Sequence, residues 1–184
     1  MKILTGKLRG QHLIFRPNPH LRPTADKARK AIFDIFQGEL ENKRVLDLFS
    51  GTGALGFEAL SQGSERVTFV EQDKAQYRQI TENIKRLGLT NQADIFCEDA
   101  LEALDKFEKS GQTFDFIFLD PPYGDEIAAK SLQKIAQNRL VNKQGFVLLE
   151  CRKKEDFPPL VGNLKLLRDK RYGQTKILIY GSSG

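Results

Sequence analysis

The sequence is poor in sulfur and lacks tryptophan: its 184 residues include two Cys, one Met and no Trp. Two cysteines, Cys97 and Cys151, are too few for a disulfide framework, and they lack the C-x-x-C spacing of zinc and redox motifs. We expect both to be small core side chains. The sequence also lacks a run of about 18 apolar residues and an apolar stretch typical of signal peptides. These absences favour a soluble cytoplasmic protein.

Basic residues are unevenly distributed along the chain, which has 29 Lys and Arg against 24 Asp and Glu. Residues 1–30 hold eight basic residues and one acid, Asp26, a net charge of +7, so residues 31–184 sum to −2. A basic segment of this kind favours a polyanionic partner, because Lys and Arg that neutralise phosphates release bound counterions. The alternative is a solvated arm that binds nothing, and charge alone does not separate the two.

Short apolar runs alternate with amphipathic stretches after residue 36, and no repeat or long linker interrupts them. The apolar runs predict buried strands at residues 44–49, 66–70, 93–97, 114–119 and 146–150. Helical spacing between them predicts helices at residues 54–62, 74–87, 100–109 and 126–138. The alternation indicates a doubly wound, Rossmann-like α/β fold with a mostly parallel sheet and helices on both faces.

The two ends of the chain differ from this pattern. Residues 3–5 and 11–16 predict a small basic hairpin, and residues 27–36 predict a helix. Residues 164–171 and 175–180 predict an antiparallel hairpin that completes a seven-stranded sheet. We therefore predict a basic extension at residues 1–36 packed on one domain at residues 37–180, with residues 181–184 resembling a linker.

A glycine-rich loop follows the first predicted core strand, since residues 51–56 have the pattern G-x-G-x-x-G. Glycines allow a tight turn and a close approach of the backbone to a nucleotide at the N-terminus of the next helix. Glu71, twenty residues after Gly51, ends the second predicted strand, where a carboxylate can accept ribose hydroxyls. The combination predicts a nucleotide cofactor, and a turn that only packs helix on strand is the alternative.

Two further acids favour S-adenosylmethionine over a dinucleotide, although both cofactors use this architecture. Asp47 ends the first strand, where a carboxylate suits the ammonium and water shell of a methionine moiety and would face a pyrophosphate unfavourably. Asp99 ends the third strand, where it can accept the adenine amino group while the next backbone N–H donates to the ring. Asp99 is also placed to cap the following helix, and both roles can hold at once.

The most specific motif, Asp120-Pro121-Pro122-Tyr123, follows the fourth predicted strand at the carboxyl end of the sheet. An exocyclic amino group reacts poorly because its lone pair is conjugated into the ring, and the Asp120 carboxylate and Pro121 carbonyl can accept its N–H bonds. Prolines hold φ near about −65° and donate no N–H, which makes the turn rigid. Tyr123 offers a ring on which a flipped base can stack. The motif predicts methylation of a nucleobase amino group, with a merely stiffened turn as the alternative.

These motifs in this order resemble the class I S-adenosylmethionine-dependent methyltransferases. The resemblance narrows to the bacterial small-subunit (16S) ribosomal RNA guanine-N2 methyltransferase family, and it runs over essentially the whole chain. It rests on Leu8-Arg9-Gly10, Leu21-Arg22-Pro23-Thr24 with Asp26 and Arg29, residues 46–61, and Asp120 to Tyr123. It implies a metal-free enzyme that uses S-adenosylmethionine to methylate one guanine of ribosomal RNA in the small subunit or its assembly intermediate. Nothing in the sequence suggests an obligate dimer, so we expect a monomer.

The resemblance also implies roles for individual residues. The cofactor would contact Thr24, Asp47, Phe49, Ser50, Gly51, Thr52, Gly53, Glu71, Gln72, Asp99 and Ala100, and Thr24 would cover it. The target base would contact Asp120, Pro121, Pro122 and Tyr123. Because the fold lacks a separate recognition domain, RNA phosphates would be held by Lys7, Arg9, Arg16, Arg22 and Arg29. Arg22 could instead brace the cover, and Arg29 could be an ordinary ion-pair partner.

Three other functions stay open from the sequence. The Asp-Pro-Pro-Tyr motif fits an N6-adenine methyltransferase acting on DNA or RNA equally well, although DNA enzymes usually carry a recognition insertion that 184 residues barely allow. A noncatalytic RNA-binding assembly factor would keep the fold, but the intact Asp120 and Tyr123 count against it. A nicotinamide oxidoreductase would share the glycine loop and Glu71.

Overall fold

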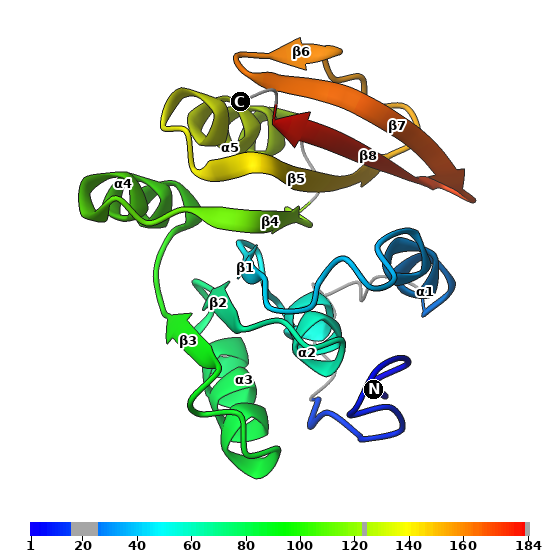
Figure 1. The fold of residues 1–184 in the computed structure, drawn as a ribbon, viewed down its shortest axis with the longest axis vertical. Coiled ribbons are helices and arrows are strands. Elements are labelled where there is room, and N and C mark those ends of the chain that lie inside the picture. Colours follow the sequence, from blue (N-terminus) through cyan, green and yellow to red (C-terminus); the bar gives the residue numbers. More distant parts are fainter. Residues whose placement is uncertain (16–25, 123–124, 183–184) are drawn as a thin grey trace.

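One mixed sheet organises the chain, and a computed structural model describes residues 1–15, 26–122 and 125–182 of it (Figure 1). Five strands are parallel: β1 (Arg44–Asp47), β2 (Arg66–Val70), β3 (Ala93–Phe96), β4 (Phe114–Leu119) and β5 (Val141–Arg152). Three more extend the sheet beyond β5, each antiparallel to its neighbour: β6 (Leu160–Val161), β7 (Leu164–Tyr172) and β8 (Thr175–Ser182). Their order is β3-β2-β1-β4-β5-β8-β7-β6, so the strand order reverses between β1 and β4.

Helices cover both faces of the sheet, and each face has its own apolar core. Helices α1 (Asp26–Ile35), α2 (Ala54–Ser61) and α3 (Lys74–Arg86) pack on one face, where Phe33 and Phe36 contact Phe118 and Phe116 edge to face. Helices α4 (Ala100–Ser110) and α5 (Asp125–Gln137) pack on the other face. This is the doubly wound, Rossmann-like arrangement that the sequence predicts, and the fold class is confirmed.

The sheet has eight strands in the described residues, one more than the sequence predicts. The additional strand, β6, is two residues long, and its Leu160 is 61% exposed. It pairs only with Leu164 and Lys165 of β7. Such a short, solvent-facing pairing leaves no period-2 pattern, so the sequence carried no signal for it.

Strand β5 begins five residues earlier than predicted, at Val141 instead of Phe146. Val141 pairs with Phe114, and the register then shifts before Phe116 pairs with Phe146. Gln144 takes a left-handed conformation with φ 63° in this irregular stretch. The polar residues of the bulge look like a loop in the sequence, but the ladder continues on both sides of it.

The N-terminal extension forms a looser hairpin than expected, with one antiparallel bridge between Lys2 and His12. The amide of Ile3 donates to Gln11 O at 2.9 Å, and that of Leu13 donates to Met1 O at 2.8 Å. Ile3 and Leu13 are buried in the same core as α1, α2 and α3. Core packing therefore holds the extension against the domain where strand pairing is sparse.

Two remaining expectations concern cysteine and membranes. Cys151 is buried as predicted, but Cys97 is exposed, because it follows the last residue of β3 and leaves the sheet at its open edge. The core prediction is thus wrong for Cys97. None of the helices within the described ranges is both long and apolar enough to span a bilayer.

Candidate active site

The loop between β1 and α2 is held against the end of β2 by Ser50 and Glu71. Ser50 Oγ donates to Asp47 O at 2.7 Å and accepts from the Val70 amide at 3.1 Å, while the Ser50 amide donates to Val70 O at 3.0 Å. The Gly51 amide donates to Glu71 Oε2 at 2.7 Å. The loop is therefore rigid, and its turn is fixed by the neighbouring strand before any ligand binds.

Glycine is required at the three positions of the loop motif for different structural reasons. Gly51 and Gly53 have φ values of 52° and 75°, a region that side chains with a Cβ rarely adopt. Gly56 lies within α2, where a Cβ would come within 2.2 Å of the Phe69 ring on β2. Gly56 thus sets the close packing of α2 on the sheet, which aims the N-terminus of α2 along the carboxyl edge.

Asp47 is a buried acid at the centre of this edge, with 1% of its surface exposed. Burial raises its pKa from the usual 3.8 to about 7, although the Gly56 amide, which donates to Oδ2 at 2.9 Å, lowers it. The charges of Asp120 and Glu71 raise the same pKa further. Two other predicted site residues, at the ends of β2 and β4, therefore lie close enough to Asp47 to act on it electrostatically.

Glu71 uses both carboxylate oxygens to hold backbone in this structure. Oε2 accepts from Gly51, and Oε1 accepts from the Asp73 amide at 2.7 Å. Partial burial raises the pKa of Glu71, against the lowering effect of these amides. Each oxygen keeps a second lone pair, so the carboxylate can accept a ligand hydroxyl while it braces the loop.

Asp99 caps α4, which is the alternative role that the sequence allowed. Its Oδ1 accepts from the amides of Leu101 at 2.8 Å and Glu102 at 3.2 Å. Both bonds go to one oxygen of a half-buried carboxylate at the end of β3, so the cap does not consume the whole group. The next residue, Ala100, is buried. Gln72 follows the end of β2 and is exposed. Its carbonyl oxygen lies 3.9 Å from Sγ of Cys97.

The remaining loop residues that we predicted to contact the cofactor have side chains turned into the protein. Ser50 and Thr52 are buried, and Phe49 packs against the core that α4 and α5 cover. Thr52 Oγ1 lies 3.9 Å from Met1 Sδ, so the start of the N-terminal extension reaches the glycine loop. Thr24, predicted to cover the cofactor, lies outside the described residues.

The Asp-Pro-Pro-Tyr motif begins at the carboxyl end of β4, as predicted. Asp120 and Pro121 are half-buried, and Pro122 is exposed. Asp120 faces Asp47 closely enough for its charge to affect the pKa of Asp47. Tyr123 lies outside the described residues. In the described ranges, no three His, Cys, Asp or Glu side chains gather as metal ligands, and the metal-free site stays a prediction.

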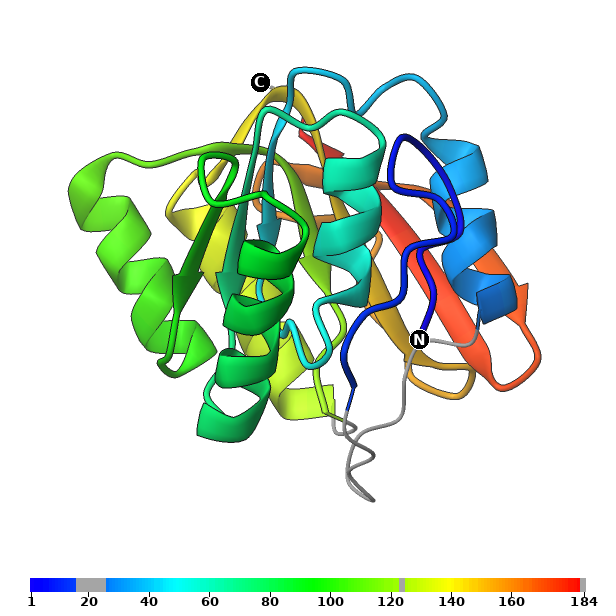
Figure 2. The ribbon, with the colours of Figure 1, turned by 90° about the horizontal axis from the view of Figure 1, so that it is seen from below.

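The predicted RNA-binding residues are not gathered around this edge. Lys7 and Arg9 are exposed on a turn that packs against Ser61, where the Lys7 amide donates to Ser61 O at 2.7 Å. Ser61 is the last residue of α2, so the turn lies about 12 Å along that helix from the glycine loop. Figure 2 shows this blue turn at the opposite end of α2 from the loop. Arg16 and Arg22 lie outside the described residues.

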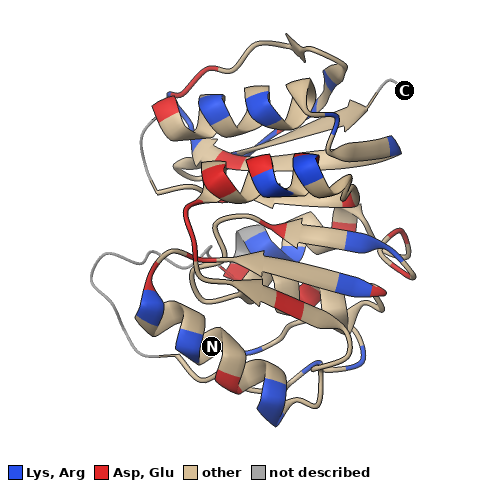
Figure 3. Cartoon of the chain, turned by 90° about the vertical axis from the view of Figure 1, so that its left-hand side faces the viewer, with Lys and Arg blue, Asp and Glu red and all other residues tan. Residues whose placement is uncertain are grey.

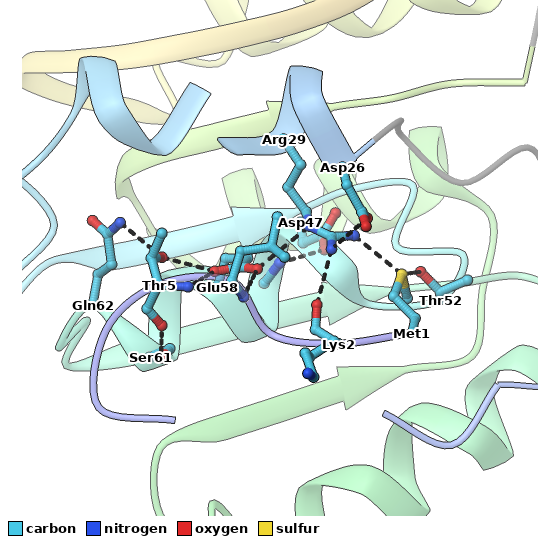
Figure 4. Close-up of polar contacts among 12 residues, drawn as sticks. Met1, Lys2, Thr5, Asp26, Arg29, Asp47, Thr52, Glu58, Ser61 and Gln62 are labelled. Atoms are coloured by element: carbon cyan, nitrogen blue, oxygen red, sulfur yellow. Dashed lines mark hydrogen bonds and ion pairs between the residues drawn. The ribbon is translucent and has the colours of Figure 1, made fainter. Parts of the chain in front are cut away.

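Arg29 does not have the exposed position that RNA contact requires, because only 1% of it is exposed. Figure 4 shows its side chain among polar groups of the N-terminal extension and α2. Its guanidinium donates to Lys2 O at 3.0 Å and to Asp26 Oδ1 at 2.9 Å, and its Nε lies 3.4 Å from Glu58 Oε1. The structure corrects the RNA assignment and supports the alternative of an ion-pair partner. The polar groups that Arg29 bridges fasten the N-terminal extension to α1 and α2.

Glu58 is the residue of this network that the sequence analysis missed. It is 1% exposed, and its carboxylate accepts from the amides of Leu4 at 2.7 Å and Thr5 at 3.1 Å, besides facing Arg29. A sequence signal was present, since Glu58 is the only charged residue in α2. A single charged residue on a fully buried helix needs a partner of opposite charge. This rule predicts a basic residue in a segment that packs on α2.

Comparisons with known proteins agree over the full length. A family model described as conserved hypothetical protein 95 matches residues 1–181. "Putative rRNA methyltransferase YlbH" of Bacillus subtilis is 35% identical over 184 residues, with 100% of both chains covered. "Ribosomal RNA small subunit methyltransferase D" of Haemophilus influenzae is 31% identical and covers 98% of this chain and 93% of its own. A solved structure, "Putative methyltransferase yhhF from Escherichia coli", has a TM-score of 0.85 at 26% identity, covering 99% of this chain and 97% of its own.

Proposed function

The chain belongs to the family described as conserved hypothetical protein 95, and we propose that it is an S-adenosylmethionine-dependent methyltransferase that modifies N2 of a guanine in small-subunit ribosomal RNA. Relatives named as ribosomal RNA methyltransferases support the substrate class. The Asp-Pro-Pro-Tyr motif and the wider sequence resemblance support an exocyclic amino group of guanine as the target.

The observation that carries the proposal is the group of three carboxylates at one edge of the sheet. The charges of Asp120 and Glu71 both raise the pKa of Asp47, so the three acids share one region of negative potential. An acidic site of this kind fits a ligand with cationic groups and disfavours a pyrophosphate. S-adenosylmethionine supplies a sulfonium, an ammonium and, on the sulfonium, a methyl group that can be transferred, so the residues present fit it.

The loop residues hold and orient such a ligand. The turn at Gly51 and Gly53 allows close backbone contact at the N-terminus of α2, and the carboxylate of Glu71 can accept ribose hydroxyls. Asp99, with one oxygen used in the cap, can accept an adenine amino group through the other. These roles extend along the ends of β1, β2 and β3, in the order that an extended adenosyl group requires.

Asp120 acts on the nucleobase. Its carboxylate and the Pro121 carbonyl accept the two N–H bonds of the amino group, which orients the nitrogen lone pair for in-line attack and stabilises the positive charge that develops on the nitrogen. The nearby Asp47 has a pKa of about 7, so at neutral pH it adds only part of a negative charge to the site. We propose that the enzyme acts as a monomer in the cytoplasm and without a metal.

A labelled methyl-transfer assay with Asp120→Ala tests this role. Small subunits that lack their native guanine-N2 marks are incubated with labelled S-adenosylmethionine, and S-adenosylhomocysteine binding is measured by calorimetry. We expect the variant to lose about 100-fold or more of the transfer rate while it binds S-adenosylhomocysteine within a few-fold of the unmodified protein. Asp34→Ala, which removes an acid from the exposed side of α1, is the matched control and should keep both properties.

Equal transfer by the Asp120→Ala protein would refute the role of Asp120. A different result would refute the cofactor: binding of a nicotinamide dinucleotide with no binding of S-adenosylhomocysteine would identify an oxidoreductase site. A protein that binds S-adenosylhomocysteine and RNA but transfers no methyl group to any RNA would be the noncatalytic assembly factor.

A further inference from the structure

A second basic region lies at the C-terminal end of the chain. The net charge of −2 for residues 31–184 does not reveal it, because an acidic segment precedes it. Residues 31–140 contain 12 basic and 19 acidic residues, a net charge of −7, whereas residues 141–184 contain nine basic and four acidic residues, a net charge of +5. The C-terminal strands are thus as distinctly basic as the domain body is acidic. Counting charge by segment along the whole chain would have found this from the sequence.

Five of these cations gather where β5 ends and β7 turns into β8, which we name the hairpin tip. Arg152 pairs with Thr175 across the β5–β8 ladder, and Thr175 pairs with Tyr172 across the β7–β8 ladder. The Lys153 amide donates to Gln174 O at 2.9 Å, which brings the residues after β5 beside the turn. The hairpin tip consists of the exposed residues Arg152, Lys153, Lys154, Lys170 and Arg171.

Acidic neighbours do not neutralise the hairpin tip. Asp169 faces Arg171 at 3.8 Å in an exposed pair, and Asp156 faces the buried Lys176 at 3.3 Å. Glu155 is buried, and its carboxylate accepts from the Arg152 amide at 3.0 Å. Glu150 lies two residues before Arg152 on β5. The five exposed cations and the buried Lys176 outnumber these four acids, so a net positive charge remains.

The hairpin tip lies at the same edge of the sheet as the candidate active site. Strands β4 and β5 are parallel, so Arg152 at the end of β5 and Asp120 after the end of β4 share one edge. Strands β8 and β7 follow in order, so at about 4.8 Å per strand β7 lies about 14 Å from β4 across the sheet. In Figure 1 the tip extends on the side toward which the arrows of β4 and β5 point.

Other charged surfaces of the domain look different. Figure 3 shows both acidic and basic residues on α4 and α5, where Lys134 pairs with Asp105 and Lys130 pairs with Glu126. Basic residues on an edge strand can serve only to prevent association with another strand. That explanation applies to Lys170 and Arg171 on β7, but it does not account for Lys153 and Lys154, which lie beyond the strand on the loop after β5.

We propose that the hairpin tip is a phosphate-binding surface that holds the RNA strand next to the target nucleotide. The proposal rests on the proposed function in taking RNA as the partner, and it adds where the RNA lies. Exposed cations on adjoining segments suit a polyanionic backbone, and their shared edge with Asp120 places the phosphates within a few nucleotides of the base. The turn of Lys7 and Arg9 lies at the C-terminal end of α2, away from the glycine loop, and would bind a more distant part of the RNA.

Charge-removing pairs of substitutions test the hairpin tip. The variants are Lys170→Gln with Arg171→Gln and, on the loop, Lys153→Gln with Lys154→Gln. The matched control is Lys43→Gln with Lys143→Gln, which removes the same charge from exposed residues at the opposite edge of the sheet. RNA affinity is measured against salt concentration with a small-subunit RNA fragment, and methyl transfer is measured with small subunits.

Each tip pair should lower the slope of log affinity against log salt by about 1.5 and weaken RNA binding roughly ten- to fortyfold at 0.1 M salt. Transfer should show a raised KM and a nearly unchanged kcat, and the control pair should match the unmodified protein. Slopes and KM values equal to those of the control would overturn the proposal. So would weaker binding to small subunits together with unchanged binding to the RNA fragment, since the tip would then contact a ribosomal protein.

The two proposals fail in different ways. If the unmodified protein transfers no methyl group but the tip pairs reduce RNA binding as expected, the proposed function fails and the surface stands. If transfer to the small subunit occurs and the tip pairs change neither slope nor KM, the surface fails and the proposed function stands.

Discussion

Asp47 is the residue whose chemistry departs furthest from its ordinary behaviour, because it is an acid sealed behind the glycine loop. One hydrogen bond from Gly56 does not offset the loss of solvation, and Asp120 and Glu71 add repulsion. An acid in this state binds a proton more tightly in the folded protein than in the unfolded chain. Its contribution to stability is therefore complete below pH 3.8 and is lost as the pH rises through about 7.

Asp47→Asn should remove this dependence, because the amide oxygen can still accept from Gly56 and the side chain no longer ionises. Between pH 5 and pH 8 the free energy of unfolding of the unmodified protein should fall relative to the variant, by at most about 1.4 kcal/mol per pH unit. Urea unfolding of both proteins at pH 5, 6, 7 and 8 measures the difference. Parallel curves across this range would show that Asp47 does not titrate there.

At the scale of elements, the buried pair of Arg29 and Glu58 connects three segments that are distant in sequence. Arg29 comes from α1 and Glu58 from α2, and both bind backbone groups of the first five residues. The partners are almost completely buried, so each charge depends on the other. Removing one partner leaves an uncompensated buried charge, which costs much more than the pair contributes.

Arg29→Met should therefore lower the free energy of unfolding by about 3 to 5 kcal/mol. The matched control is Lys30→Met, the next residue on α1, which is 61% exposed and pairs with the exposed Asp34, and this change should cost less than about 1 kcal/mol. Adding Glu58→Gln to Arg29→Met should recover part of the loss. If Arg29→Met costs no more than the control in urea unfolding, the extension is not anchored by this pair.

Elements with a clear period could be predicted from the sequence, and elements without one could not. The helix expected at 74–87 is present as α3. Its ends were predictable because Asp73 caps the start, accepting from the amides of Ala75 and Gln76, and Gly88, with φ 69°, follows the end. Strand β6 was missed because two residues are too short for a periodic pattern, and the start of β5 was missed because its polar residues resemble a loop. The burial of Arg29 also escaped prediction, because it depends on which segment packs on α2.

At the scale of the whole molecule, charge is separated across the sheet. The carboxyl edge carries Asp47, Glu71 and Asp120 at its centre, and the basic hairpin tip lies beside them. Such an arrangement lets a cationic cofactor and an anionic nucleic acid approach the same edge at different strands. The sequence predicted the acidic centre from its motifs, but it attributed the basic surface to the first 30 residues alone.

The measurement that tests the central claim most directly identifies the methylated nucleoside. Small subunits without their native guanine-N2 marks, naked ribosomal RNA and duplex DNA are each incubated with the protein and labelled S-adenosylmethionine, then digested to nucleosides and separated by chromatography with mass detection. The account predicts label in N2-methylguanosine from the small-subunit RNA and none in the DNA. Label in N6-methyladenosine instead would contradict it.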